Sequence, residues 1–163
     1  MPRDNETQKT ADQTIAVFKA MAYDIAAPYI WSNAIAKYDH MGYYRIKNIS
    51  TRRSIVCQIA FASENFKKAY NAPGAIRCKL PTDGRFLVMS EHFRNQLDVP
   101  EPKSDENRYG DFTIEKLHDT WLTPYIASRY VPDPYVRHSI MLGTVGIIVG
   151  VIGVFIGILG LIV

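Results

Sequence analysis

The longest uninterrupted hydrophobic stretch lies at the C-terminal end of the chain. Residues 139–163 carry no charged side chain, and their only hydroxyl groups are those of Ser139 and Thr144. A helix of this length extends about 37 Å, at about 1.5 Å of rise per residue. Since the hydrocarbon core of a bilayer is about 30 Å thick, the stretch is long enough to cross it with some tilt. We therefore predict one C-terminal transmembrane α-helix and assign residues 136–163 as a single-pass anchor.

Glycines recur through this anchor at spacings that alternate between three and four residues. They are Gly143, Gly146, Gly150, Gly153, Gly157 and Gly160. This heptad rhythm places all of them on one stripe of a helix. Helices associate in lipid through close backbone approach, which small residues permit. We expect the glycine stripe to pack against another helix, either a copy of itself or a partner subunit.

Ahead of the anchor, the pattern predicts a flexible polar arm over residues 1–11 and a soluble domain over residues 12–135. A helix is expected over about residues 12–27, because Ile15, Phe18, Ala22, Ile25 and Tyr29 recur at helical spacing. Pro28 should end or kink this helix. Proline also suits a first helical turn, so a second helix is expected from Pro28 onward, over residues 28–38.

From Tyr43 the hydrophobic period changes to two. Residues 43–50 and 53–61 alternate and are rich in β-branched and aromatic side chains, which predicts an antiparallel hairpin. Its candidate core residues are Tyr44, Ile46, Ile55, Cys57, Ile59 and Phe61. Ser63 is expected to begin a short helix that runs to Tyr70.

A second hairpin is expected from residues 75–80 and 85–90, joined by a turn of Pro, Thr, Asp and Gly, and followed by a short helix capped by Ser90. Residues 98–111 are charged and contain two prolines, which is typical of a loop. An amphipathic helix broken at Pro124 is expected over residues 112–130. The prediction is an α+β fold, in which antiparallel hairpins are flanked by helices.

Aromatic and basic side chains gather between this domain and the anchor. Arg129, Tyr130, Tyr135, Arg137 and His138 are predicted to form a collar at the membrane interface. The sequence favours neither the membrane-interface collar nor the core of the soluble domain as the location of Trp121. The N-terminal residues do not resemble a signal peptide, and the hydrophobic span comes last. We expect a tail-anchored protein whose soluble domain stays on the side of synthesis, in a mitochondrial inner, bacterial, archaeal or viral membrane.

Composition and residue spacing restrict the ligands and reactions that we expect for this chain. A net charge of +3, from 19 basic and 16 acidic residues, does not favour nucleic acid as a partner. Cys57 and Cys78 lack a CxxC spacing, and two reduced core thiols are favoured over a disulfide. The histidines His40, His92, His118 and His138 lie in different segments without metal-ligand spacing. We expect no metal, no cofactor and no enzymatic activity.

Three functional hypotheses follow. The first is a non-catalytic subunit of a larger membrane assembly, such as an accessory subunit of a respiratory-type complex or a membrane-anchored virion component. Its partners are membrane lipid and other transmembrane subunits, or copies of itself, met through the glycine stripe. The second is a self-assembling, pore-like or fusion-like protein. The third is a membrane-anchored enzyme whose site is built from scattered residues, with His92 or His118 as the base.

Overall fold

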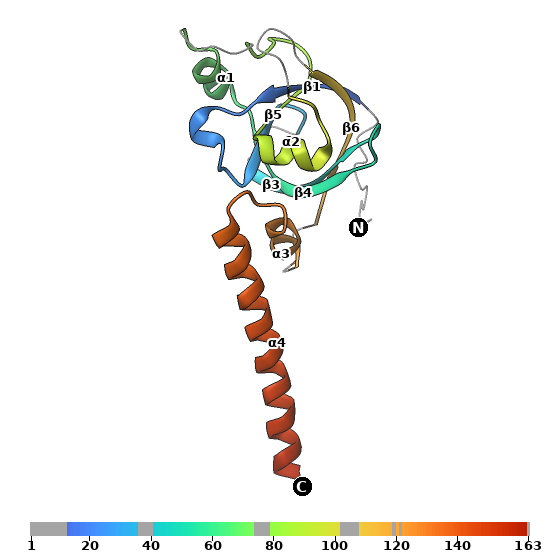
Figure 1. Cartoon of the computed structure of the whole chain (residues 1–163), viewed down its shortest axis with the longest axis vertical. Coiled ribbons are helices and arrows are strands. Elements are labelled where there is room, and N and C mark those ends of the chain that lie inside the picture. Colours follow the sequence, from blue (N-terminus) through green and yellow to red (C-terminus); the bar gives the residue numbers. More distant parts are fainter. Residues whose placement is uncertain are drawn as a thin grey trace, which may run out of the picture.

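The computed structural model describes residues 13–35, 41–73, 79–101, 108–118, 120 and 122–162. A barrel of strands forms one end of the molecule, and a long helix extends away from it (Figure 1). The strands are β1 (Gln13–Lys19), β2 (Tyr29–Ser32), β3 (Met41–Asn48), β4 (Ser54–Phe61), β5 (Phe86–Met89) and β6 (Arg108–Lys116). The helices are the 3₁₀ helix η1 (Ala22–Asp24), α1 (Glu64–Tyr70), α2 (Glu91–Leu97), α3 (Thr123–Ser128) and α4 (Pro134–Ile162).

The six strands close into a barrel in the order β1-β5-β2-β4-β3-β6. β1 pairs in parallel with β5, and β2 pairs in parallel with β4, whereas the other neighbours are antiparallel. The predicted α+β class is therefore correct, but the sheet is mixed and closed rather than a set of antiparallel hairpins. Closure pairs both edges of every strand, which removes the free edges at which chains aggregate.

The barrel interior holds the larger of two hydrophobic clusters, here called the interior cluster. Alternate strand positions supply it, and α2 adds Phe93 and Leu97, so this helix covers the ring of strands seen in Figure 1. Its buried members are Ile15, Val17, Ile30, Ile35, Tyr44, Ile46, Ile55, Cys57, Ile59, Leu87, Met89, Phe93, Leu97, Val99, Phe112 and Ile114. Inward-facing alternate residues are what a small closed barrel requires.

A second, exterior cluster lies between α1 and the outer side of β1 and β5. Its buried members are Ala16, Phe18, Met21, Ala62, Phe66, Tyr70, Leu80, Phe86 and Val88. Trp31 of β2 packs against it and stacks on Phe66, with the ring centroids 4.4 Å apart. Strands β1 and β5 are thus buried on both sides, which explains the apolar runs of residues 15–18 and 86–89.

The hairpin and the two short helices are found where the sequence places them. β3 and β4 are antiparallel, with Tyr44 opposite Cys57 and Ile46 opposite Ile55. Five of the six candidate core residues are buried, and Phe61 is half-buried against the interior cluster. Ser63 caps α1, since its Oγ accepts a hydrogen bond from the Phe66 backbone N–H at 3.3 Å.

The two helices predicted near the N-terminus are wrong. The first of the two segments forms strand β1 instead, where Ile15, Ala16, Val17 and Phe18 are all buried. These four consecutive apolar residues face the interior and exterior clusters in turn, a pattern that also satisfies helical spacing. The second is strand β2, which pairs with β4 and β5. The arm over residues 1–11 lies outside the described residues.

The second half of the predicted domain also needs correction. β5 pairs with β1 and β2, so the hairpin proposed between residues 75–80 and 85–90 does not form through β5. The loop predicted over residues 98–111 ends earlier, because β6 begins at Arg108. The helix predicted over residues 112–130 is strand β6 in its first part, with Phe112 and Ile114 facing inward. Only its last part is helical, as α3, which has Pro124 in its first turn.

Candidate functional site

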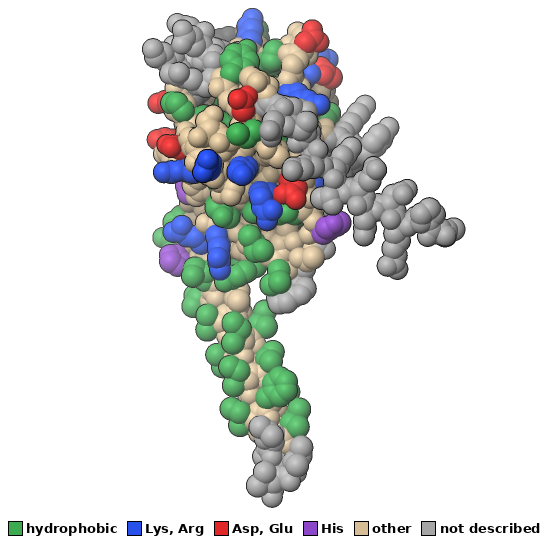
Figure 2. Space-filling model, turned by 90° about the vertical axis from the view of Figure 1, so that its right-hand side faces the viewer, with side chains coloured by type: hydrophobic (Ala, Val, Ile, Leu, Met, Phe, Trp, Pro, Cys, Tyr) green, Lys and Arg blue, Asp and Glu red, His purple; other side chains and the backbone are tan. Residues whose placement is uncertain are grey.

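Helix α4 is the most distinctive feature of the molecule. Its Pro134–Ile158 portion has 25 residues, and the most apolar 18-residue window within it has a mean hydropathy of 2.5, with 0% of that window buried against the rest of the chain. Within the described part of the chain, it is the one helix long and apolar enough to cross a membrane. Figure 2 shows hydrophobic side chains along the part of α4 that extends away from the domain. The long apolar helix expected at this place is therefore present and exposed.

The glycine stripe has free space in front of it. A Cβ atom added at Gly143, Gly146, Gly150, Gly153 or Gly157 would meet nothing of this chain within 4 Å. Gly160 also belongs to α4, but its surroundings lie outside the described residues. The hydroxyl of Thr144 donates to the Ile140 carbonyl at 2.9 Å, so this polar group is satisfied within the helix. The stripe therefore plays no packing role within the chain.

The predicted collar residues lie close to the start of α4 but in different environments. Tyr135 is 82% exposed, Arg129 and His138 are exposed, and Arg137 is half-buried. The Arg129 guanidinium lies 5.3 Å from the centre of the Tyr125 ring. Tyr130 instead packs, half-buried, against the interior cluster. The side chain of Trp121 lies outside the described residues. On the face in Figure 2, Lys, Arg and His side chains are prominent where the domain meets α4.

The connection between barrel and anchor is held by hydrogen bonds. His92 of α2 places Nε2 3.1 Å from the Tyr130 carbonyl oxygen and 2.7 Å from the Gln96 side-chain amide. The Tyr130 carbonyl accepts a hydrogen bond from His92 in the tautomer that carries its proton on Nε2. Asp133 Oδ1 accepts from the Tyr135 N–H at 2.8 Å and so begins α4.

The titratable groups that the structure describes differ in burial and in surroundings. No cluster of three or more histidines, cysteines and carboxylates suited to a metal ion occurs among the described residues. Burial raises the pKa of the free Cys57 thiol above its ordinary value, which makes it unreactive. Cys78 lies outside the described residues. Burial is also the main cause that raises the pKa of Asp24, and interactions with Trp31 and Tyr29 oppose it.

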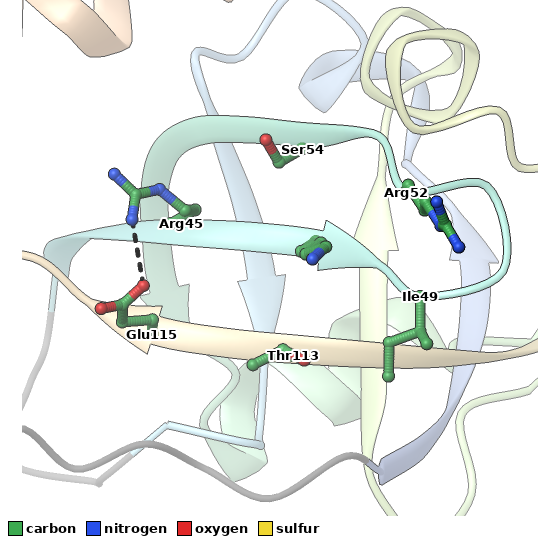
Figure 3. A pocket seen from close by; sticks show the side chains of 7 residues that line it. Arg45, Ile49, Arg52, Ser54, Thr113 and Glu115 are labelled. Atoms are coloured by element: carbon green, nitrogen blue, oxygen red, sulfur yellow. Dashed lines mark hydrogen bonds and ion pairs between the residues drawn. The ribbon is translucent and has the colours of Figure 1, made fainter.

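A depression of about 610 Å³ lies on the outer surface of β3, β4 and β6. Figure 3 shows its lining, which comes from outward-facing strand positions and from the β3–β4 turn. The lining residues are Arg45, Lys47, Ile49, Arg52, Ser54, Thr113 and Glu115. Sequence analysis did not identify this basic depression, although the alternation of β3 already places Arg45 and Lys47 on one face.

The turn beside this depression holds Arg52 in an unfavourable backbone conformation. Its φ is 59°, a left-handed value that costs a residue with a side chain about 1–2 kcal/mol. The turn is held against α2, because Asn48 Nδ2 and Thr51 Oγ1 both donate to the Leu97 carbonyl, at 3.0 and 3.1 Å. These bonds also satisfy a carbonyl at the end of α2. The conformation of Arg52 is therefore imposed by its surroundings.

Comparison with known proteins identifies no family. No family model matches the chain, and no curated protein matches it. Among solved structures, the rationally designed mkDPBB_sym2 protein is 16% identical, with a TM-score of 0.39, over 65% of this chain and 99% of the designed one. The rationally designed mkDPBB_sym_86 protein is 14% identical, with a TM-score of 0.39, over 66% of this chain and 94% of that protein. The protein is a closed six-stranded mixed β-barrel followed by an exposed apolar helix.

Proposed function

We propose that this chain is a non-catalytic, tail-anchored, single-pass subunit of a larger membrane assembly. The observation that carries the proposal is α4, an apolar helix whose most apolar window has no residue buried against the rest of the chain. An exposed apolar surface of this size is unfavourable in water, and a bilayer removes it from water. An accessory subunit of a respiratory-type complex and a membrane-anchored virion component both belong to this class.

The glycine stripe supports association with further helices in the membrane. Five of its glycines face open space, so a neighbouring helix can approach the backbone of α4 closely. The barrel supports a structural role, since its interior is filled by side chains and its buried thiol is unreactive. The domain then stands on the side of synthesis, with basic side chains next to the bilayer.

The self-assembling, pore-like alternative has less support. A water-filled pore needs polar groups along its lumen, and the hydroxyl of Thr144 is already bonded within its own helix. The anchored-enzyme alternative relies on His92 or His118 as a base. His92 is engaged with the Tyr130 carbonyl at the junction between barrel and anchor, which favours a structural role for this imidazole.

Truncation after Arg137 tests the anchor. The barrel and α1 to α3 remain complete in this variant, because α4 packs against the rest of the chain mainly through α3. We expect the truncated chain to be soluble and folded, and the full chain to stay with membranes after a carbonate wash. Retention of the truncated chain on washed membranes would reveal a second attachment and contradict the proposed single anchor.

A further inference from the structure

The depression on β3, β4 and β6 is rich in hydrogen-bond donors. In the strand register, Lys47 lies between Thr113 of β6 and Ser54 of β4. Arg52 extends from the β3–β4 turn at one end of the depression, and Arg45 lies at the other end (Figure 3). The surface thus presents ammonium, guanidinium and hydroxyl groups within one cavity.

The charge of this lining is unbalanced. Arg45, Lys47 and Arg52 carry three positive charges, and Glu115 carries one negative charge, which leaves a net charge of +2. Glu115 is bound to Arg45, with Nη1 and Oε2 3.2 Å apart. Neither Lys47 nor Arg52 forms an ion pair with any residue that the structure describes. Two cations are therefore available for an anion that carries about two negative charges.

The backbone of the turn gives an independent reason to assign a role to Arg52. Glycine or asparagine is the usual residue at a left-handed position. Among the described residues, Arg52 and Asp98 are the two with a side chain that have a positive φ, and Asp98 holds the C-terminal cap of α2. A strained arginine at the edge of a basic cavity indicates that its side chain serves a purpose other than folding. The hydrogen bonds of Asn48 and Thr51 to α2 fix the turn and so direct this side chain.

We propose that the depression binds a phosphate-bearing anion, with Lys47 and Arg52 as its principal ligands. A phosphate group accepts bonds from guanidinium, ammonium and hydroxyl donors at once, and at neutral pH a phosphate monoester carries the charge that this lining lacks. The phosphate belongs either to a soluble compound or to a lipid headgroup of the membrane into which α4 inserts. This inference does not depend on which helices the anchor meets.

The test uses the full chain in nanodiscs and follows backbone amide signals by NMR at constant ionic strength. One arm adds inorganic phosphate to phosphatidylcholine nanodiscs, with chloride as the control salt. The other arm replaces part of the phosphatidylcholine with phosphatidate and adds no phosphate. Saturable shifts at Lys47, Arg52 and Thr113 in the first arm support a soluble ligand, and shifts at these residues only in the second arm support a lipid headgroup.

Variants separate a built site from general positive charge. We expect Lys47→Gln and Arg52→Gly each to weaken binding by at least about tenfold, because each removes a charge-assisted contact. Arg53→Gln is the matched control, since Arg53 lies next to Arg52 but approaches Asp98, with Nε 3.9 Å from Oδ2. It should change binding by less than about twofold, as expected for screened surface charge.

Folding and binding are distinguished by the same variants. Arg52→Gly relieves the left-handed strain, so its melting temperature should equal or exceed that of the original chain. Loss of binding without loss of stability supports the site. An absence of saturable shifts in both arms overturns the proposal, and so does an equal loss of binding in Arg53→Gln.

Discussion

Replacing Gly150 and Gly153 with isoleucine alters the middle of the glycine stripe without touching the packing of this chain. A Cβ at either position meets nothing of the chain within 4 Å. On the helix-propensity scale the change favours the helix by about 0.5 kcal/mol per site. Isoleucine is also favourable at the centre of a membrane span. Any loss of association in this double variant therefore reports on a neighbouring helix.

The size of that loss follows from the contacts that glycine permits. Two glycines at a close helix crossing allow about two to four Cα–H···O contacts, each worth about 0.5–1 kcal/mol. Isoleucine side chains would force the helices apart and remove them, a loss of roughly 1–4 kcal/mol. At about 1.4 kcal/mol per tenfold, association should weaken by about fivefold to about 700-fold.

The assay is the fraction of the full chain that remains bound to its neighbours after gentle solubilisation. Two controls accompany it. Gly150→Ala with Gly153→Ala adds one methyl group per site and should keep most of the association, because small residues still permit close approach. Ile148→Phe with Val151→Phe adds bulk on the other side of α4 and should leave association unchanged. Unchanged association of the isoleucine variant, or an equal loss in the phenylalanine control, would refute the stripe hypothesis.

Two further predictions concern the domain. Burial raises the pKa of Asp24 above its ordinary value of 3.8, so the folded state binds a proton more readily than the unfolded state. The stability from this group is present below the unfolded pKa and is lost as pH rises through the folded pKa. Asp24→Asn should flatten this decline in melting temperature as pH rises above the ordinary pKa of 3.8. An unchanged slope would contradict the buried carboxyl as its source. His92→Ala removes the hydrogen bond to Tyr130, which is worth about 1 kcal/mol. We expect this variant to exchange backbone amide hydrogens faster at the junction between barrel and anchor. The control His118→Ala, at an exposed histidine, should leave this exchange unchanged. Equal exchange in both variants would contradict the role of His92.

The β3–β4 hairpin and the anchor were predictable because their patterns are local. Ile46 alternates with polar residues on β3, and β4 follows it directly with the β-branched and aromatic residues typical of a strand, so a period of two identifies the hairpin. The anchor needs only length and composition. The strand β6 also carries a local signal, since Phe112 and Ile114 alternate with polar neighbours, but the longer amphipathic pattern through Pro124 predicts a helix instead.

The closed barrel was not predictable because its key pairings join distant segments. β1 lies parallel to β5, with Val17 opposite Leu87. These strands are far apart in the sequence, so no turn between them predicts the pairing. Burial on both sides makes residues 15–18 of β1 continuously apolar, which hides the period of two. The basic depression was missed for a related reason. Lys47, Arg52 and Thr113 meet only after β6 has paired with β3.

The central proposal is that this chain is one subunit of a larger membrane assembly, joined through α4. Mass spectrometry of the full chain, gently solubilised and natively purified from its own membrane, tests it most directly. The account predicts a stoichiometric set of other membrane proteins that travels with the chain, and loss of that set from the Gly150→Ile, Gly153→Ile variant. A lone monomer would contradict the account, and a single species of several identical chains would favour the self-assembling alternative instead.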